Sequence, residues 1–112
     1  MSIANDVIYQ SVDSKVESFG DGNLYDLIAD ELHYQIRFQD GAVQKVGGRN
    51  GWQNEELLAV LINRMNYLQG KFPCRENAIV ITKLEEALLW LEKRTSSRQK
   101  QGVEGHDLPH KS

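Results

Sequence analysis

Cysteine is scarce in this sequence, and Cys74 is the single one in 112 residues. One cysteine cannot form an intrachain disulfide, and no second cysteine or suitably spaced histidine lies near it to complete a zinc site. We therefore expect no disulfide framework, no bound metal and no other cofactor.

Long apolar runs are also missing. The longest, residues 57–62, is far shorter than the roughly 20 residues that cross a bilayer. Residues 1–6 lack the basic stretch of a secretory signal peptide. These absences predict a protein of the cytosol without a membrane partner.

The chain carries no excess of positive charge. Its formal net charge is -3 and its isoelectric point is near 5.6. Long DNA or RNA is therefore a poor ligand candidate, because nucleic-acid binders present a basic surface to the phosphates. A small anion is still compatible with this charge, because one or two arginines and some backbone N–H groups suffice to hold it.

The first half of the chain has the pattern of strands and turns. Residues 33–39 alternate between apolar and polar side chains, which is typical of a half-buried strand. Asp40-Gly41 follows, a dipeptide that favours a two-residue hairpin turn, and residues 42–46 can form the returning strand. The sequence thus predicts a β-hairpin over 33–46.

A second hairpin is predicted upstream. Residues 14–19 and 24–28 flank the turn-forming segment 20–23 and can pair as strands. Residues 24–32 can also be read as a short helix, and the pattern leaves both interpretations open.

The apolar spacing changes to three and four residues after the glycine-rich segment 47–51. This period predicts a helix over about 53–69, with Asn54 as its cap and Gly70 at its end. A second helix is predicted over about 73–97, with Pro73 in its first turn. Only a tight loop separates the two helices, so they form an αα-hairpin.

The second predicted helix has two apolar faces. One is a seam at alternating spacings of three and four, formed by Ile81, Leu84, Leu88 and Leu91. The other carries Leu89 and Trp90, while Val80, Ala87 and Arg94 lie along a separate line. The first helix can cover only one face, so a second copy of the chain is expected on the other.

The expected fold class is therefore α+β: a small N-terminal antiparallel β-sheet followed by a C-terminal αα-hairpin, in an oligomer. With 40% hydrophobic residues, the chain can build one structural domain but not two. Within that domain we expect a β-rich segment at 1–50, the helical hairpin at 51–98 and a frayed polar tail at 99–112.

No arrangement of residues suited to catalysis can be recognised. The sequence contains no Ser-His-Asp, Cys-His or phosphate-loop spacing. Glu85 and Glu86 are adjacent carboxylates, but neighbouring lysines make them charges of a solvated helix face. The chain is therefore expected not to be an enzyme.

Three helical residues are candidates for binding, each with a plainer alternative. Asn77 lies on the seam of the second helix, so its amide can face the interior and would then need a hydrogen-bond partner. Either it caps the helix locally or it contacts a ligand. Tyr67 belongs to the core or forms a stacking platform. Arg94, like Arg98, either complements the helix dipole or binds an anion.

Several segments together resemble the Thoeris anti-defence sponge family of phages, over about residues 34–105. The helical part is similar to the hairpin domain that this family shares with phage anti-CBASS sponges. The segments that carry the resemblance are 50–59, Cys74-Arg75-Glu76-Asn77-Ala78, Thr82-Lys83-Leu84-Glu85-Glu86-Ala87 continuing to 91, Arg94-Thr95 and 102–105. The chain departs from the family at Gln53, where relatives often carry a serine or threonine cap, and in its first thirty residues.

The resemblance implies a protein that sequesters cyclic ADP-ribose isomers without cleaving them, in the cytoplasm of an infected bacterium. Some relatives also hold cyclic di- or trinucleotides at separate sites of a hexamer. Carried onto matching positions, the pocket would use Tyr67, Asn77 and Arg94, with Arg75 and Arg49 as weaker candidates. Relatives often have phenylalanine at the position of Tyr67. The preferred isomer and the choice between dimer and hexamer are left open.

Helix geometry adds a constraint to this pocket. Asn77 and Arg94 are seventeen residues apart on one helix, or about 25 Å at about 1.5 Å per residue. One small ligand cannot span that distance, so a shared ligand requires Arg94 from a second, antiparallel chain.

Two other functions are alternatives to sequestration. One is an interaction adaptor without a nucleotide ligand. The other, less compatible with the sequence, is a hydrolase.

Overall fold

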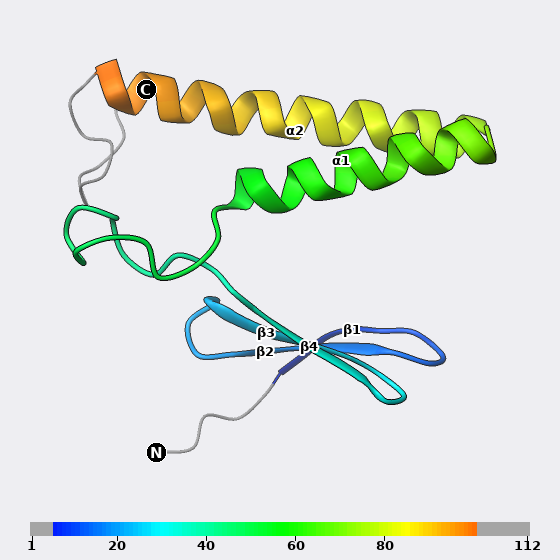
Figure 1. Cartoon of the computed structure of the whole chain (residues 1–112), viewed down its shortest axis with the longest axis horizontal. Helices are drawn as coiled ribbons and strands as arrows, with labels where there is room; N and C mark the ends of the chain where they lie inside the picture. Colours follow the sequence, from blue (N-terminus) through cyan, green and yellow to red (C-terminus); the bar gives the residue numbers. More distant parts are fainter. Residues whose placement is uncertain (1–5, 101–112) are drawn as a thin grey trace. The chain divides into compact units, whose positions relative to one another are not determined.

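The computed structural model of the chain describes residues 6–100, and the side chains as far as Arg98 (Figure 1). The chain divides into two compact units, one that runs to Trp52 and one that begins at Gln53. The first contains four β-strands and the second contains two helices. This architecture confirms the expected α+β class, with the sheet first and the αα-hairpin after it.

The sheet is an antiparallel meander with the strand order β1-β2-β3-β4. Its central hairpin joins β2 (Lys15–Phe19) to β3 (Leu24–Ala29). Gly20 and Gly22 in the turn between them have positive φ angles of 77° and 83°. The predicted upstream hairpin is confirmed, and the alternative of a helix over 24–32 is wrong.

The hairpin predicted over 33–46 is wrong. Strand β4 (Leu32–Arg37) pairs antiparallel with the preceding strand, β3. A two-residue turn at Asp30 and Glu31 joins the two strands, and Asp30 has a φ of 50° there. Residues 42–48 form a coiled turn in place of a strand: the N–H groups of Lys45 and Val46 both donate to the carbonyl of Ala42, at 3.0 and 3.1 Å. These local hydrogen bonds take the backbone groups that a returning strand would have needed.

Strand β1 (Asp6–Gln10) was not anticipated from the sequence. It pairs antiparallel with β2, with an irregularity in the register between Val7 and Tyr9. Its burial is low, because it forms the sheet edge and all five residues are exposed. A segment with so little burial shows no clear apolar alternation, which is why the sequence pattern missed it.

A polar row crosses the sheet. Glu17, Asp26 and Gln35 lie opposite one another on β2, β3 and β4. Asp26 is only 9% exposed; its carboxylate accepts a hydrogen bond from Gln35 Nε2 at 3.0 Å and lies 3.2 Å from His33 Nε2. The side chains of Gln35 and His33 thus link β4 to β3 in addition to the backbone ladder.

Helix α1 (Asn54–Lys71) lies close to the predicted range, but its cap differs from the predicted one. Gln53, and not Asn54, is the cap residue: its N–H donates to Glu56 Oε1 at 2.9 Å, and the Glu56 N–H donates to the Gln53 carbonyl at 3.1 Å. The helix continues past Gly70, which has ordinary helical backbone geometry and therefore does not end it.

Helix α2 (Arg75–Lys100) runs beside α1 and is joined to it by a short loop (Figure 1). It starts after Pro73 and continues beyond the predicted end at Ser97. The remaining residues of the predicted tail, 101–112, lie outside the described residues. The seam is confirmed, since Ile81, Leu84, Leu88 and Leu91 are half-buried, and the other half-buried positions of the helix are Asn77, Thr95 and Ser97.

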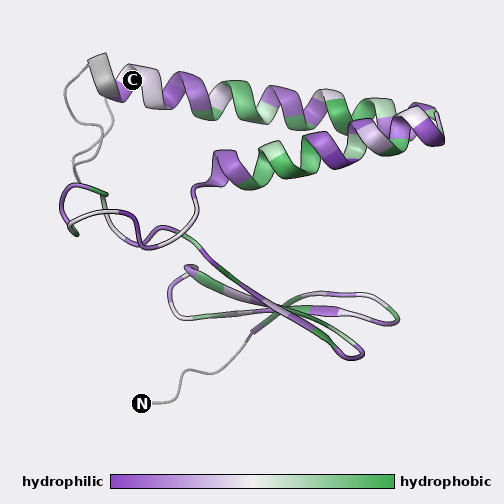
Figure 2. Cartoon of the chain, viewed as in Figure 1, coloured by the Kyte–Doolittle hydropathy of each residue, from purple (hydrophilic) through white to green (hydrophobic). Residues whose placement is uncertain are grey.

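Neither unit buries an apolar side chain completely. Among the described residues, the only buried side chains are those of Asp26 and Arg98, and no hydrophobic residue is buried. Figure 2 shows hydrophobic stretches alternating with hydrophilic ones along both helices. Large apolar side chains are instead exposed on the hairpin, namely Val60, Leu61, Tyr67, Phe72, Ile79, Val80, Leu89 and Trp90.

Neither α1 nor α2, as far as the structure describes them, is apolar over a stretch long enough to cross a bilayer.

Candidate functional site

Tyr67 is not a core residue. It lies near the end of α1 and is 56% exposed. Two cations flank its ring: the Arg64 guanidinium is 5.9 Å and the Lys71 ammonium 5.2 Å from the ring centroid. Lys71 Nζ also donates to the Tyr67 hydroxyl at 3.2 Å.

This group, Arg64, Tyr67 and Lys71, follows from helical spacing, because residues three and four apart share one face. From the sequence only Tyr67 is a candidate, and the two cations were missed. They hold the ring in place by cation–π contact and give its surroundings a positive charge. An aromatic face beside two cations suits a ligand that is both planar and anionic.

Asn77 lies in the first turn of α2, at the same loop end of the hairpin as Tyr67. It is half-buried, and its amide Nδ2 donates to the carbonyl of Phe72 at 3.4 Å. Its N–H donates to Cys74 Sγ, also at 3.4 Å. In this chain Asn77 therefore has a local partner, but these long bonds engage only part of its hydrogen-bonding capacity.

The loop itself is held by Gln69. Its side-chain Nε2 donates to the Cys74 carbonyl at 3.1 Å, and its Oε1 accepts from the Cys74 N–H at 3.0 Å. A side-chain amide thus forms a pair of hydrogen bonds across the loop, as two peptide groups would. This pair fixes the loop that joins the end of α1, which carries Tyr67, to the start of α2, which carries Asn77.

Arg94 lies at the opposite end of the hairpin. Its neighbour Thr95 donates from Oγ1 to Glu55 Oε2 at 3.3 Å, so this part of α2 packs beside the start of α1. Arg94 itself is exposed. Within one chain the fold thus brings Tyr67 and Asn77 to one end and keeps Arg94 far from both.

The two weaker candidates occupy different places. Arg75 is the first residue of α2 and is exposed at the loop end, with Asn77. Arg49 belongs to the first unit, where its guanidinium lies over the Trp52 ring, 5.5 Å from the centroid. Arg98, considered from the sequence as a complement to the helix dipole, is instead 7% exposed and occupies the seam position after Thr95.

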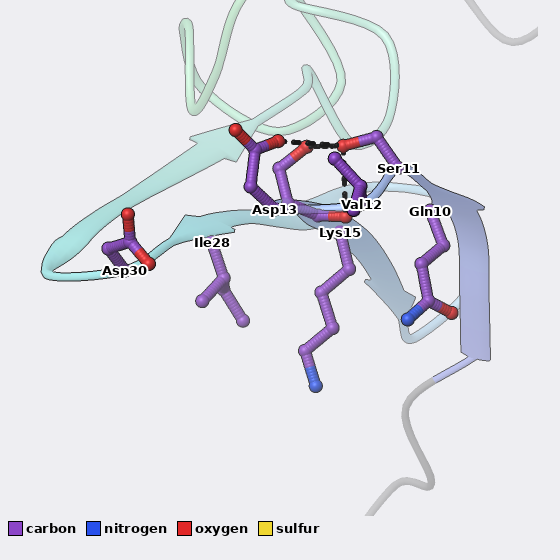
Figure 3. Close-up of a pocket in the computed structure, with 8 residues that line it drawn as sticks. Gln10, Ser11, Val12, Asp13, Lys15, Ile28 and Asp30 are labelled. Atoms are coloured by element: carbon purple, nitrogen blue, oxygen red, sulfur yellow. Dashed lines mark hydrogen bonds between the residues drawn. The ribbon is translucent and has the colours of Figure 1, made fainter.

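A hollow of about 230 Å³ lies at the turn between β1 and β2 (Figure 3). Ser11 Oγ contacts Ser14 Oγ at 2.6 Å and Asp13 Oδ1 at 3.1 Å, so the polar groups of the turn bind one another. Gln10, Lys15 and Ile28 extend away from this cluster in the figure. Asp13 and Asp30 both line the hollow, which makes it unfavourable for an anion.

The described residues contain no group of three or more His, Cys, Asp or Glu side chains placed to hold a metal ion. Cys74, the single cysteine, is exposed and unpaired by any disulfide.

Comparison with known proteins gives two matches. Residues 30–96 match the family described as Acb2/Tad1, hairpin domain. The chain is also 55% identical over 71 residues to the protein named Thoeris anti-defense 1 of Bacillus phage SBSphiJ7. That alignment covers 62% of this chain and 49% of the relative, so the matched part spans about half of the relative's length.

Proposed function

The chain belongs to the Acb2/Tad1 hairpin-domain family, and from that premise we propose that it is a phage anti-defence protein that sequesters a nucleotide immune signal. The relative's name supports the anti-defence role. The ligand that we propose is a cyclic ADP-ribose isomer, with cyclic di- or trinucleotides as further ligands. The protein would act in the cytoplasm of the infected bacterium and release its ligand unchanged.

The observation that carries the proposal is the exposed ring of Tyr67 between Arg64 and Lys71. An adenine ring can stack on the tyrosine, which is worth about 1–3 kcal/mol per base in comparable cases. The diphosphate of the same ligand would lie in the field of the cations. Asn77, with hydrogen-bonding capacity left over, would contact a ribose hydroxyl or a base edge.

A second copy of the chain completes this pocket in our proposal. Arg94 lies about 25 Å along α2 from Asn77, at about 1.5 Å per residue, which is too far for both to contact one small ligand. An antiparallel partner related by a two-fold axis would bring its own Arg94 to the loop end. The exposed apolar side chains of both helices, such as Leu89 and Trp90, support an interface of this kind.

Sequestration without cleavage agrees with the side chains near Tyr67. The contacts of the ring in the described residues are with two cations, Arg64 and Lys71, which can hold a phosphate by charge. A protein that does not turn over its ligand must bind it more tightly than the host receptor does. A dissociation constant in the nanomolar range, about -12 kcal/mol, would meet this requirement.

The experiment that tests the function is capture followed by release. The protein is mixed with cyclic ADP-ribose isomers and with cyclic di- and trinucleotides, separated from free ligand, heated and assayed for the released molecule. Release of the intact ligand supports sequestration. A converted product would indicate a hydrolase, and no uptake of any ligand would favour a protein-binding adaptor.

A pair of variants tests the site. Tyr67→Ala should weaken capture about 5- to 150-fold, the equivalent of about 1–3 kcal/mol of stacking. Tyr67→Phe keeps the ring and loses only an exposed hydrogen bond, so its affinity should stay within a few-fold of the parent. Equal affinity of the alanine variant and the parent would remove Tyr67 from the site.

A further inference from the structure

The sheet unit contains a second hollow with binding chemistry, distinct from the helical hairpin. It has a volume of about 470 Å³ and is lined by Arg37, Arg49, Asn50, Gly51 and Trp52. Volumes of roughly 300–1,000 Å³ are typical of small-molecule sites. The lining combines two guanidinium groups with one indole ring, and no carboxylate is among these five residues.

The segment that lines the hollow lies close to the backbone at the end of β4, and Gly51 permits this close approach. A Cβ atom on Gly51 would lie 2.4 Å from the carbonyl carbon of Phe38 and 2.8 Å from the carbonyl oxygen of Arg37. Only glycine therefore lets this segment lie against the end of β4. The Trp52 N–H then donates to the Arg37 carbonyl at 2.9 Å, and the Trp52 carbonyl accepts from Gln39 at 2.9 Å.

Asn50 fixes the other side of the loop. Its Oδ1 accepts from the Asp40 N–H and its Nδ2 donates to the Asp40 carbonyl, each at 2.8 Å. Its own N–H donates to Gln39 Oε1 at 2.9 Å. These bonds order the loop before any ligand binds, so binding costs less conformational entropy.

The two arginines are placed in different ways. Arg49 is anchored: its guanidinium lies 5.5 Å from the Trp52 centroid, and Nη2 donates to the Gly51 carbonyl at 3.2 Å. Arg37 extends from the last position of β4, and no carboxylate among the described residues lies within ion-pair distance of it. Trp52 is 55% exposed, which leaves much of the indole available to a ligand.

We propose that this hollow is a binding site for a nucleoside diphosphate, separate from the hairpin site. The two guanidinium groups would hold the diphosphate through charge-assisted hydrogen bonds, and the base would stack on the exposed part of Trp52. The site lies wholly within residues 37–52. It therefore stands or falls independently of the function proposed for Tyr67, Asn77 and Arg94.

The sequence itself provides the probe, because the chain has two tryptophans, one in each unit. In Trp90→Phe the emission comes from Trp52 alone, and ADP, AMP, adenosine and inorganic phosphate are titrated separately. We expect a saturable change in emission with ADP, weaker binding of AMP, and no saturation with adenosine or phosphate. Equal responses to ADP and adenosine, or to ADP and phosphate, would overturn the proposal.

Charge variants in the same background locate the site. Arg37→Gln should weaken ADP binding about tenfold or more, as expected for one lost charge-assisted contact. Lys45→Gln removes the same charge from a neighbouring turn that does not line the hollow, and should change the affinity less than twofold. An equal loss in both variants would reduce the effect to general electrostatics and contradict the assignment.

Two further measurements separate this proposal from the hairpin function. Tyr67→Ala must leave the Trp52 response to ADP intact, and a lost response would overturn the inference. If Trp90→Phe fails to fold, fluorine NMR of the parent chain labelled with 5-fluorotryptophan gives one resonance per indole. The resonance that Trp52→Phe removes must then shift with ADP; a shift confined to the other resonance would place the ligand at the hairpin.

Discussion

The two units of the chain are stabilised by different kinds of contact. The sheet is held by backbone ladders and by a polar row around Asp26, whereas the hairpin is held by one apolar seam between two helices. The most buried side chains are charged in both, Asp26 in the sheet and Arg98 in the hairpin. Within the described residues, neither unit thus has a closed hydrophobic core.

The difference between the units also separates their surfaces. One exposed aromatic of the hairpin, Tyr67, projects from a regular helix and contacts cations three and four residues away. One exposed aromatic of the sheet unit, Trp52, is positioned by a loop in which Gly51 approaches the backbone of Phe38. Variants that affect one mechanism should leave the other intact.

The largest effect is expected from breaking the seam of the hairpin. Leu84→Asp puts a charge at a half-buried position between α1 and α2, and should cost about 3 kcal/mol or more of the free energy of unfolding. Urea unfolding followed by helical circular dichroism measures this. Lys83→Asp is the control, because Lys83 is exposed on the same helix and its variant should retain the helical signal. Equal unfolding by both would show that the seam does not stabilise the single chain.

A similar but local effect is expected in the sheet unit. Gly51→Ala forces a Cβ atom into the backbone of Phe38, and should cost about 2–4 kcal/mol or detach the segment around Trp52. Trp52 emission in the Trp90→Phe background should then resemble that of a solvated indole. Unchanged emission and stability would mean that the close approach does not hold this loop.

The polar row of the sheet should contribute less. Asp26→Ala removes the acceptor of Gln35 and the partner of His33, and should cost about 1–3 kcal/mol because buried polar groups lose their hydrogen bond. Thermal unfolding compares it with Asp21→Ala, a change in the exposed turn between β2 and β3. If Asp21→Ala lowered the thermal midpoint more than Asp26→Ala, the turn would contribute more than the polar row to the stability of the sheet.

The smallest effect has the opposite sign. Gly70 lies inside α1, and nothing within 4 Å would meet an added Cβ atom. Gly70→Ala should therefore stabilise the helix by up to about 1 kcal/mol, the difference in helix propensity between the two residues. A raised thermal midpoint is expected, and a fall would show that the glycine has a role in the loop that follows.

The helices could be predicted from the sequence because their apolar period extends over many turns. The seam through Leu84 and Leu88, and the half-buried place of Asn77 on it, follow from a spacing of three and four. Helix ends were less predictable: the cap moved to Gln53 because Glu56 bonds back to its N–H. Of the site, Tyr67 was identified, but the role of Arg64 and Lys71 became visible only with the ring geometry.

The sheet was harder to predict for a physical reason. Asp40-Gly41 favours a hairpin turn more than Asp30-Glu31 does, yet β4 turns back at Asp30, which adopts a positive φ of 50°. The pairing of β4 with β3 over all six residues outweighs the local preference of the turn. The hollow at Arg37 and Trp52 depends on contacts between residues 37–40 and 49–52, which no local pattern reveals.

The proposal that two antiparallel chains share one ligand can be tested by complementation. Tyr67→Ala and Arg94→Ala chains should each bind cyclic ADP-ribose more weakly than the parent, but each carries the residue that the other lacks. After unfolding together and refolding, random pairing about a two-fold axis should restore about a quarter of the sites, measured as intact ligand released on heating. No sites of parental affinity in the mixture, with oligomers formed and the parent protein active, would contradict a pocket built from two chains.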